Sequence, residues 1–387
     1  MTSYLGTKIE PKTELVIENE NIELTEEMKL AIEEEAEQED PFDAPIPLFE
    51  MPELDQFKAK KMFSDALILD EAVKYWQRTG FPYRALSTAE CMLELQKLAE
   101  TDNASLVNTA LGYQVADTFH RHRVHASARG MHSPYDAFQD EKKLRKALRL
   151  QLKHGGNTKL AVTGVISLVN GTQACSNFRP GFACYLYRKY CPEGGVVLDT
   201  STGYGGRLLG AVASQVVSKY IGIDPNTETH LANIKMIEEL HLRELLEFEL
   251  HNLPAEDIAV EVPANSCDFS FTSPPYFSKE IYSPQETQSC NRYTTWESWV
   301  DGFLKPMLRL THDALKPDAK AVINVAETIR MRGGEVCNLG EATQHAAFER
   351  GFMLEDVLRF PMSKRMSGST TEETAVAFEP VYVFSKV

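Results

Sequence analysis

The sequence lacks several features that would assign it to common protein classes. No apolar run among its 387 residues approaches the roughly 18 residues needed to cross a bilayer, which excludes a transmembrane helix. The segment Met1–Glu10 lacks the basic and apolar parts of a signal peptide, so secretion is not expected. None of the seven cysteines forms a C-x-x-C pair, and their number is odd. Free thiols in a reducing, cytoplasmic setting therefore fit better than disulfides or a zinc site.

Basic residues are also in short supply, with 40 lysines and arginines against 56 acidic residues and a net charge of −16. A surface of that sign argues against a nucleic-acid partner. The excess acid is concentrated in residues 1–40, which hold 13 acids and three bases and are expected to form a disordered tail. In contrast, residues 117–160 hold ten lysines and arginines, four acids and five histidines. One basic segment is therefore present, and the tail is either merely solvated or a competitor for the polyanions that this segment could bind.

Residues 41–171 show helical periodicity and are expected to form an N-terminal, mainly helical domain. Capping residues, glycines and prolines mark the ends of its helices. Helices are expected over 57–78, from the capping box Ser87-Thr88-Ala89-Glu90 to about Ala99, and from near Ser133 or Ala137 to Gly155-Gly156.

The third of these helices carries a stripe of basic side chains. Its cations recur at intervals of four, three and four residues, which places them on one face: Lys142, Lys146, Arg149 and Lys153. Such a stripe is either a solvated face or a surface that contacts phosphates. The second interpretation gains weight from Arg121 and Arg123, which alternate with three histidines just upstream. A metal site at those histidines is disfavoured, because the arginines repel a cation and no acid or cysteine completes the ligand set.

From residue 172 to residue 387, apolar runs alternate with helical stretches. This alternation predicts an α/β domain built on a mostly parallel sheet. Strands are expected at 196–199, 220–224, 248–250, 267–271, 319–325, 352–360 and 381–384, and helices at 206–216, 227–242 and 296–310.

Two motifs at the ends of the first two strands indicate a nucleoside-containing cofactor. Asp199 begins a turn that contains Gly203 and Gly205, where glycines let a ligand approach the N–H groups of the following helix. Asp224 closes the second strand 25 residues later, where a carboxylate can accept hydrogen bonds from both ribose hydroxyls. No G-x-x-x-x-G-K-[ST] motif is present, which disfavours a P-loop.

A third motif, Thr272-Ser273-Pro274-Pro275-Tyr276-Phe277, follows the fourth expected strand. Its two prolines remove backbone donors and leave rigid carbonyls at the carboxyl edge of the sheet. Such acceptors can hold both protons of an exocyclic amine, and the tyrosine ring offers a face on which a planar base can stack. In isolation the motif would be a proline-rich turn, but together with the Gly-rich turn and Asp224 it predicts a base-binding site.

Taken in order, Asp199…Gly203-x-Gly205, Asp224 and Ser273-Pro-Pro-Tyr276 resemble the motifs of the S-adenosylmethionine-dependent DNA amino-methyltransferases. The resemblance covers roughly residues 117–387, and it departs from the common D-P-F-x-G-x-G turn at Thr200 and Ser201. It implies a Rossmann-like methyltransferase sheet, S-adenosylmethionine as cofactor and DNA as partner. Flanking segments resemble a phage- and bacterium-associated branch of the family: 176–180, Gly205-Gly206-Arg207 and 379–384.

The resemblance also implies a role for each matching residue. Asp224 would bind the ribose, and Glu256 or Asp257 the adenine amine. The methionine end of the cofactor would lie against Asn177, Phe178, Arg179, Asp199, Gly203 and Gly205. The target base would be held by Ser273, Pro274, Pro275 and Tyr276, with Phe277 in support.

The expected chemistry is in-line displacement at a sulfonium methyl by the exocyclic amine of a flipped base. Hydrogen bonds from the amine to Ser273 Oγ and to the Pro274 carbonyl would draw its nitrogen toward tetrahedral geometry. In the family that the sequence resembles, serine before Pro-Pro-Tyr is more usual for N4-cytosine than for N6-adenine, so N4-cytosine is favoured. C5-cytosine methylation is disfavoured, because no Pro-Cys nucleophile motif is present.

Contacts to DNA are expected outside the sheet, because only 15 residues separate Asp257 from Thr272. The basic N-terminal residues and the polar insertion Ser278–Thr295, which holds Lys279 and Arg292, are the expected contacts; a second insertion spans Ser363–Thr374. Three alternatives stay open: methylation of RNA, N-methylation of protein, and a non-catalytic DNA-binding module on a methyltransferase fold. No metal is expected.

Overall fold

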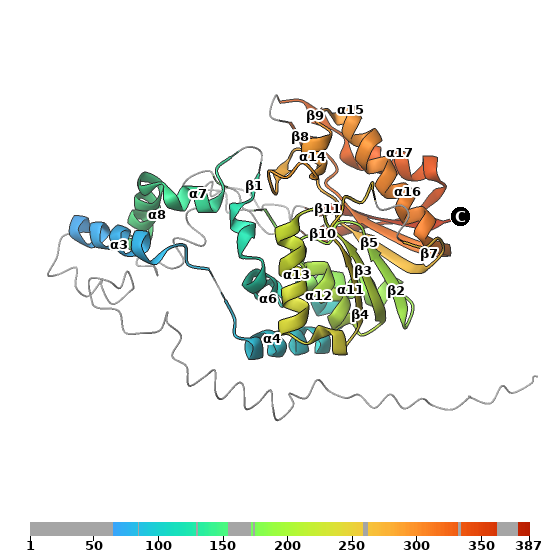
Figure 1. The fold of residues 1–387 in the computed structure, drawn as a ribbon, viewed down its shortest axis with the longest axis horizontal. Helices are drawn as coiled ribbons and strands as arrows, with labels where there is room; N and C mark the ends of the chain where they lie inside the picture. Colours follow the sequence, from blue (N-terminus) through green and yellow to red (C-terminus); the bar gives the residue numbers. More distant parts are fainter. Residues whose placement is uncertain are drawn as a thin grey trace, which may run out of the picture.

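The computed structural model describes residues 65–83, 85–128, 131–153, 172, 175–257, 262–331, 334–361 and 378–387 (Figure 1). The predicted acidic tail at 1–40, the first residues of the helix expected over 57–78, and the insertion Ser363–Thr374 lie outside these ranges, as does the side chain of Lys153. None of the helices within the described ranges has the length and apolar character that crossing a membrane requires.

One seven-stranded sheet forms the centre of the larger part of the molecule, with the strand order β10-β11-β7-β5-β2-β3-β4 (Figure 1). The five strands from β7 to β4 run parallel, whereas β11 is antiparallel to both of its neighbours. This doubly wound sheet confirms the predicted α/β class with a Rossmann-like sheet. The strands are β2 (Gly195–Asp199), β3 (Val217–Ile223), β4 (Glu247–His251), β5 (Cys267–Thr272), β7 (Leu315–Asn324), β10 (Phe352–Pro361) and β11 (Phe378–Lys386).

Helices cover both faces of the sheet, because successive side chains of a strand point to opposite faces. Val197 of β2 packs in the core beneath α11 (Pro180–Tyr190), α12 (Gly206–Ser214) and α13 (Thr227–Glu239). Its neighbour Leu198 packs in the core on the other face. The helices of that face are α15 (Trp296–Trp299), the π-helical turn η4 (Val300–Leu304), α16 (Lys305–Ala314) and α17 (Leu339–Arg350).

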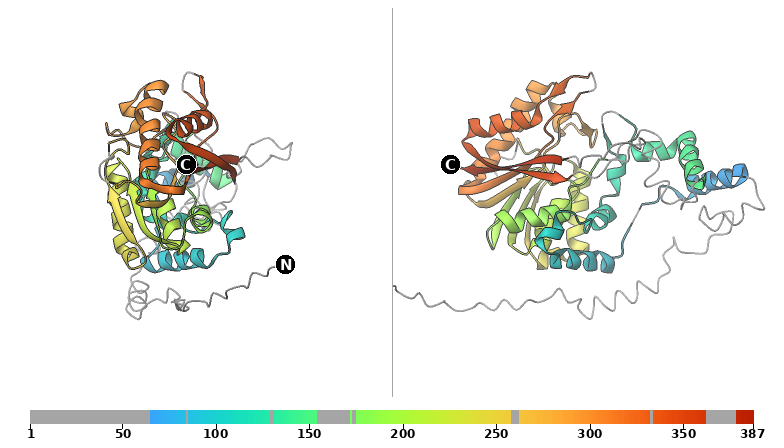
Figure 2. Two further views of the ribbon diagram at one scale, coloured as in Figure 1. Left: turned by 90° about the vertical axis from the view of Figure 1, so that its right-hand side faces the viewer. Right: turned by 180° about the vertical axis from the view of Figure 1, so that it is seen from behind.

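The N-terminal helices divide between two cores. Helices α4 (Thr88–Glu100) and α6 (Tyr113–Phe119) place apolar side chains in the core that α11 and α12 share with the sheet. A second, separate core lies around Trp76 and Leu144 and joins three other helices, here called the three-helix unit, which projects away from the sheet (Figures 1 and 2). The unit consists of α3 (Asp65–Thr79), α7 (Pro134–Gln139) and α8 (Glu141–Lys153).

Two of the predicted helix starts can be compared directly with the structure. The capping box at Ser87 and Glu90 is present, so that prediction is confirmed. The single helix expected from near residue 133 is wrong, because the chain forms α7 and then α8. Ser133 caps α7, and Asp140 lies outside both helices while its carboxylate accepts the N–H groups of Lys142 and Lys143 at 2.9 and 3.2 Å.

Several short elements connect these parts. β1 (Ser127–Ala128) pairs antiparallel with β6 (Glu280–Ile281), which ties the N-terminal region to the segment after β5. The remaining elements are α5 (Asn103–Leu106), the 3-10 turns η1 (Arg121–His125) and η3 (Leu242–Glu244), α14 (Ser289–Arg292), β8 (Ile329–Arg330) and β9 (Val336–Cys337).

Candidate functional site

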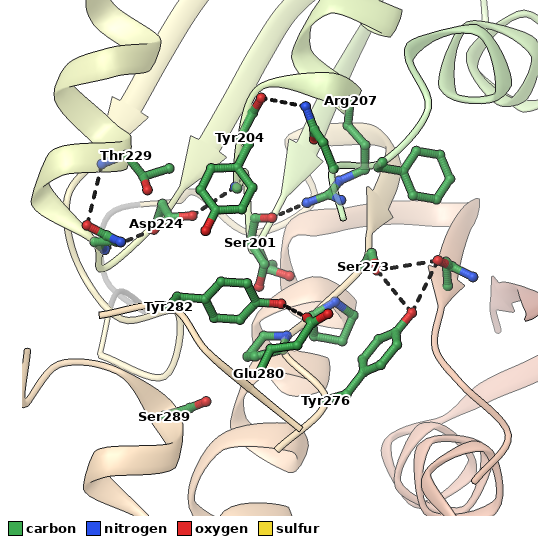
Figure 3. Close-up of a pocket in the computed structure, with 18 of the residues that line it drawn as sticks. Ser201, Tyr204, Arg207, Asp224, Thr229, Ser273, Tyr276, Glu280, Tyr282 and Ser289 are labelled. Carbon is green, nitrogen blue, oxygen red and sulfur yellow. Dashed lines mark hydrogen bonds between the residues drawn. The ribbon is translucent and has the colours of Figure 1, made fainter. Parts of the chain in front are cut away.

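A cavity of about 390 Å³ opens at the carboxyl ends of β2, β3, β5 and β7 (Figure 3). In doubly wound sheets, a crevice forms at this edge, at the point where the strand order reverses. Asp224 lies on one side of the cavity, and Ser273 and Tyr276 lie on the other. The structure therefore brings the predicted cofactor motif and the predicted base-binding motif to one continuous space.

The Gly-rich turn borders this cavity, and its backbone conformation depends on two glycines. Gly203 and Gly205 have φ angles of +59° and +76°, in the left-handed region. A Cβ atom on Gly205 would lie 2.7 Å from Met236 Cε and 2.9 Å from Asn233 Oδ1. The Asn233 side chain of α13 donates to the Gly203 carbonyl at 3.0 Å and so holds the turn against this helix.

Asp224 is held at the edge of β3 by two backbone N–H groups. Its Oδ2 accepts from Gly203 at 2.8 Å, and its Oδ1 accepts from Asn226 at 2.9 Å. Burial raises the pKa of this carboxyl from 3.8 to about 6, against the lowering effect of the two hydrogen bonds. Each carboxylate oxygen keeps a lone pair that can accept a hydroxyl from a ligand in the cavity.

Asp199 serves the site indirectly. Its fully buried carboxylate accepts from Arg207 Nε at 2.8 Å and from the Tyr220 hydroxyl at 2.6 Å. Arg207 also donates to the Ser201 carbonyl, and it lines the cavity. Among the described residues that line the cavity, Asp199, Gly205 and Asp257 are absent. The structure therefore places these three predicted cofactor contacts outside the cavity lining: Asp199 is buried, whereas the Asp257 side chain is exposed.

Of the two acids predicted after the third strand, Glu256 is the one that lines the cavity. Its side chain is 4% exposed, and burial raises its pKa. Arg292, predicted as a DNA contact, donates to Glu256 at 3.0 Å and to Asp257 at 2.8 Å. Arg292 is therefore engaged within the chain, where its one positive charge is shared between two acids.

The segment Asn177-Phe178-Arg179 also lines the cavity. Asn177 Nδ2 donates to the Tyr204 carbonyl at 2.9 Å, which ties the segment to the Gly-rich turn. The Phe178 ring stacks on Phe360 of β10 with centroids 4.9 Å apart. These contacts shape an apolar wall around the polar floor of the cavity.

The base-binding motif forms a hydrogen-bonded group with side chains from two later strands. The Tyr276 hydroxyl donates to Glu379 Oε2 at 2.8 Å and lies 3.5 Å from Ser273 Oγ. Asn324 Oδ1 lies 3.4 Å from both the Ser273 and Tyr276 hydroxyls (Figure 3). Tyr276 is only 8% exposed, and Lys279 Nζ lies 4.9 Å from the centre of its ring. Both prolines of the motif also line the cavity.

Sequence reasoning missed several residues that border the cavity. Asn324 and Glu379 belong to β7 and β11, far along the chain from Tyr276, and were not predicted as site residues. Gln288 Nε2 and the Thr200 and Tyr204 hydroxyls are buried there without a hydrogen-bond partner among the described residues. Thr200 and Tyr204 belong to the Gly-rich turn, Gln288 to the insertion Ser278–Thr295 and Glu379 to the segment 379–384, whereas Asn324 had no sequence signal.

The predicted DNA-contacting residues fall into two groups. Lys142, Lys146 and Arg149 have exposed side chains along α8, whose opposite face buries Leu144 and Leu148. Arg121 is exposed as well. Arg123 instead forms an ion pair with Asp117 at 2.7 Å and donates to the Cys175 carbonyl at 2.7 Å, while Lys279 lines the cavity.

His120 and His122, which flank Arg121, contact polar side chains of α13. His120 Nε2 lies 3.1 Å from Asn233 Oδ1, and burial lowers the pKa of His120 to about 3. His122 Nε2 lies 2.9 Å from Thr229 Oγ1 on α13. Within the described ranges, no group of three or more histidines, cysteines and acids is arranged to hold a metal ion.

Comparisons with known proteins add similarity of fold alone. No family model matches the sequence, and no curated protein matches it. TrmN from Thermus thermophilus matches with 17% identity and a TM-score of 0.37 over 54% of this chain and 49% of its own. The tRNA (m1A58) methyltransferase TrmI from Aquifex aeolicus matches with 17% identity and a TM-score of 0.36 over 55% of this chain and 70% of its own. Geranyl diphosphate C-methyltransferase from Streptomyces coelicolor A3(2) matches with 10% identity and a TM-score of 0.38 over 59% of this chain and 80% of its own.

The match to TrmN thus spans about half of that chain's length. A likeness of this degree assigns no role to any side chain of the cavity.

Proposed function

We propose that this protein binds S-adenosylmethionine and methylates the exocyclic amine of a base flipped out of duplex DNA. One observation carries the proposal: a single cavity is lined by Asp224 and the Gly-rich turn on one side and by Ser273–Tyr276 on the other. A cofactor bound by the first set would direct its reactive end toward a base bound by the second.

The donors and acceptors around the cavity fit this cofactor. Asp224 would accept the two ribose hydroxyls, and the buried Glu256 carboxylate would accept the adenine amine. The Gly-rich turn and the segment 177–179 would enclose the methionine moiety. The unpartnered Gln288, Thr200 and Tyr204 side chains offer further polar atoms that a ligand could satisfy. When bound, the cofactor would supply a sulfonium methyl group, which is already strongly activated.

The base site would act mainly by positioning. The lone pair of an exocyclic amine is conjugated into the ring and is a poor nucleophile. Hydrogen bonds from its two protons to Ser273 Oγ and to the Pro274 carbonyl would draw the nitrogen toward tetrahedral geometry and align it for in-line attack. The nucleotide must leave the duplex stack to reach this depth.

The exposed cations on α8 support a nucleic-acid polymer as the substrate. Lys142, Lys146 and Arg149 form a stripe on a three-helix unit that projects from the sheet (Figure 1). A stripe of this kind can follow a phosphate backbone while the base enters the cavity. The resemblance of Ser273-Pro-Pro-Tyr276 favours cytosine N4 over adenine N6 as the methylated position.

Incubation with labelled S-adenosylmethionine and unmethylated genomic DNA, followed by digestion and mass spectrometry, tests the proposal. Labelled N4-methylcytosine is expected, and N6-methyladenine alone would overturn the choice of cytosine. Labelled 5-methylcytosine would overturn the mechanism. Parallel incubations with RNA and protein test the other substrates, and label in either one alone would move the assignment there. Cofactor and DNA binding without transfer would identify a non-catalytic module.

A further inference from the structure

We propose that Glu379 is the terminal acceptor of the proton that the methylated amine releases, and that it receives this proton through Ser273 and Tyr276. The inference rests on the proposed function, since it concerns the same amine. It assigns a task to a buried carboxyl group that no sequence motif of the site requires.

The geometry forms a short chain of oxygen atoms that leads from the cavity to Glu379. Ser273 Oγ lies 3.5 Å from the Tyr276 hydroxyl, which lies 2.8 Å from Glu379 Oε2. All three residues line the cavity, and Glu379 is 9% exposed. The first contact is long, as contacts in sites without substrate often are, and we expect it to shorten when an amine occupies the site.

The direction of the hydrogen bonds suits transfer toward Glu379. The Asn324 amide donates through Nδ2 to the Pro380 carbonyl at 3.1 Å, so its Oδ1 faces the two hydroxyls as an acceptor. The Tyr276 hydroxyl donates its proton to the Glu379 carboxylate, so the lone pairs of the Tyr276 oxygen can accept from Ser273. The single Ser273 proton can point either to Asn324 Oδ1 at 3.4 Å or to Tyr276 at 3.5 Å, and transfer requires the second orientation. Each oxygen can therefore pass one proton onward as it receives one.

The surroundings of Glu379 make it a stronger base than an exposed glutamate. The charged and titratable groups that face it are Tyr276, Lys279 and Glu280. Burial raises the pKa of Glu379, while the hydrogen bond from Tyr276 and the charge of Lys279 act in the opposite direction. Burial also raises the pKa of Tyr276 well above its ordinary value, so the phenol conducts a proton without accumulating as phenolate.

The proposed step is balanced. The N–CH₃ bond forms as the S–CH₃ bond breaks, so the sulfonium becomes a neutral thioether and the amine becomes a cation. That cation gives one N–H proton to Ser273 Oγ while the Ser273 proton moves to Tyr276 and the Tyr276 proton moves to the Glu379 carboxylate. Glu379 ends as a neutral carboxylic acid and returns its proton to solvent after the product leaves.

Single-turnover methyl transfer to unmethylated DNA, measured at saturating cofactor across about pH 5 to 9, tests the relay. The wild-type rate should fall as the pH falls through the raised pKa of Glu379. Glu379→Gln should lower the rate by about 100-fold and abolish this acidic limb, because the amide cannot accept the proton. Tyr276→Phe should give a similar loss, the double variant should lose little more, and Glu379→Asp should restore part of the rate and the acidic limb.

A second tyrosine–glutamate pair, between Tyr382 of β11 and Glu327 just after β7, provides a matched control. The Tyr382 hydroxyl donates to Glu327 Oε2, also at 2.8 Å, and neither residue is among those that line the cavity within the described ranges. Tyr382→Phe and Glu327→Gln should therefore leave the pH profile unchanged.

A readout without turnover is the infrared C=O band of a protonated carboxylic acid, recorded against pH in the protein alone. This band should be lost in Glu379→Gln and should shift in Tyr276→Phe. The relay would be overturned if a folded Glu379→Gln variant kept the wild-type rate, or if the carboxylic-acid band were the same in Tyr276→Phe as in the wild-type protein. Absence of transfer to any nucleic acid by the wild-type protein would instead overturn the proposed function and the relay with it.

Discussion

Arg207 and Asp199 form an ion pair beneath the Gly-rich turn, with side chains that are only 6% and 0% exposed and an Nε–Oδ2 distance of 2.8 Å. The pair links the end of β2 to the start of α12, and through the Ser201 carbonyl it holds the turn itself. An acid in this position therefore supports the floor of the cavity from behind.

We expect Asp199→Asn to destabilise the fold by about 3–5 kcal/mol, because it leaves the Arg207 charge buried without its partner. Denaturant unfolding followed by circular dichroism measures this loss. The exposed pair of Lys235 and Glu239 on α13, with side chains 63% and 50% exposed, is the control. Glu239→Gln should change the unfolding free energy by no more than about 0.5 kcal/mol. Equal effects of both substitutions would contradict a special role for the buried pair.

Asp224→Ala should weaken S-adenosylmethionine binding about 30- to 150-fold, since a hydrogen-bonded carboxylate on two hydroxyls contributes roughly 2–3 kcal/mol. Isothermal titration calorimetry gives the affinity directly. In the wild-type protein, the affinity should also fall as the pH falls below about 6, where Asp224 takes up a proton. Unchanged affinity in a folded Asp224→Ala variant would remove this residue from the site.

The Asp224 carboxyl also makes the free energy of unfolding depend on pH. Folding raises the pKa of Asp224 from 3.8 to about 6, so between these values the folded state keeps a proton that the unfolded chain has lost. The contribution of Asp224 to stability is therefore greatest below about pH 4 and declines as the pH rises through about 6. Asp224→Asn should remove this decline, which denaturant unfolding of both proteins across that range would reveal.

Gly205→Ala should impair both the fold and the cofactor site, because a Cβ atom would meet Met236 Cε at 2.7 Å and Asn233 Oδ1 at 2.9 Å. Gly194 is a matched control, with a φ of +68° and no atom within 4 Å of the position that a Cβ atom would take. Gly194→Ala should cost only the backbone strain of about 1 kcal/mol, and Gly205→Ala about 1–3 kcal/mol more. Equal melting temperatures of the two variants would show that the close packing under the turn is unimportant.

Charge reversal of Lys142, Lys146 and Arg149 to glutamate should weaken DNA binding and reduce its salt dependence by about one unit of slope per lost phosphate contact. Fluorescence anisotropy at several salt concentrations measures both effects. Cofactor affinity should stay unchanged, because α8 lies outside the cavity wall in the described part of the chain. Lys235→Glu on α13 is the matched control for the single reversal Lys142→Glu, because each changes the net charge by −2. An equal salt dependence in these two single variants would indicate that the stripe is only a solvated face.

Much of the sheet could be predicted from the sequence because its strands are short apolar runs between helical periods. The strands expected at 196–199 and 220–224 correspond to β2 and β3, and the helices that follow them begin at Gly206 and Thr227 as expected. Helix α11 escaped prediction because residues such as Phe182, Cys184 and Leu186 are buried on most of its sides, so it lacks an amphipathic pattern.

The site was predictable only where its residues are close together in the sequence. Ser273 and Tyr276 belong to one motif, but their hydrogen-bond partners Asn324 and Glu379 enter from strands that reach the site through the topology of the sheet. Asp199 shows that even a residue inside a motif can have a contact that the sequence does not reveal. A motif can predict that an acid ends a strand, but only packing reveals that this acid faces Arg207.

The interrupted layout of the three-helix unit has an evolutionary consequence. Helix α3 and the pair α7–α8 share one core, yet the chain between them, 88–119, contributes to the core of the sheet. No single crossover in a gene could exchange the unit alone; such an exchange would need three matched junctions, after α3, before α7 and after α8. The three-helix unit and the sheet are therefore expected to be inherited together, so that relatives of this chain should either keep both or lack both.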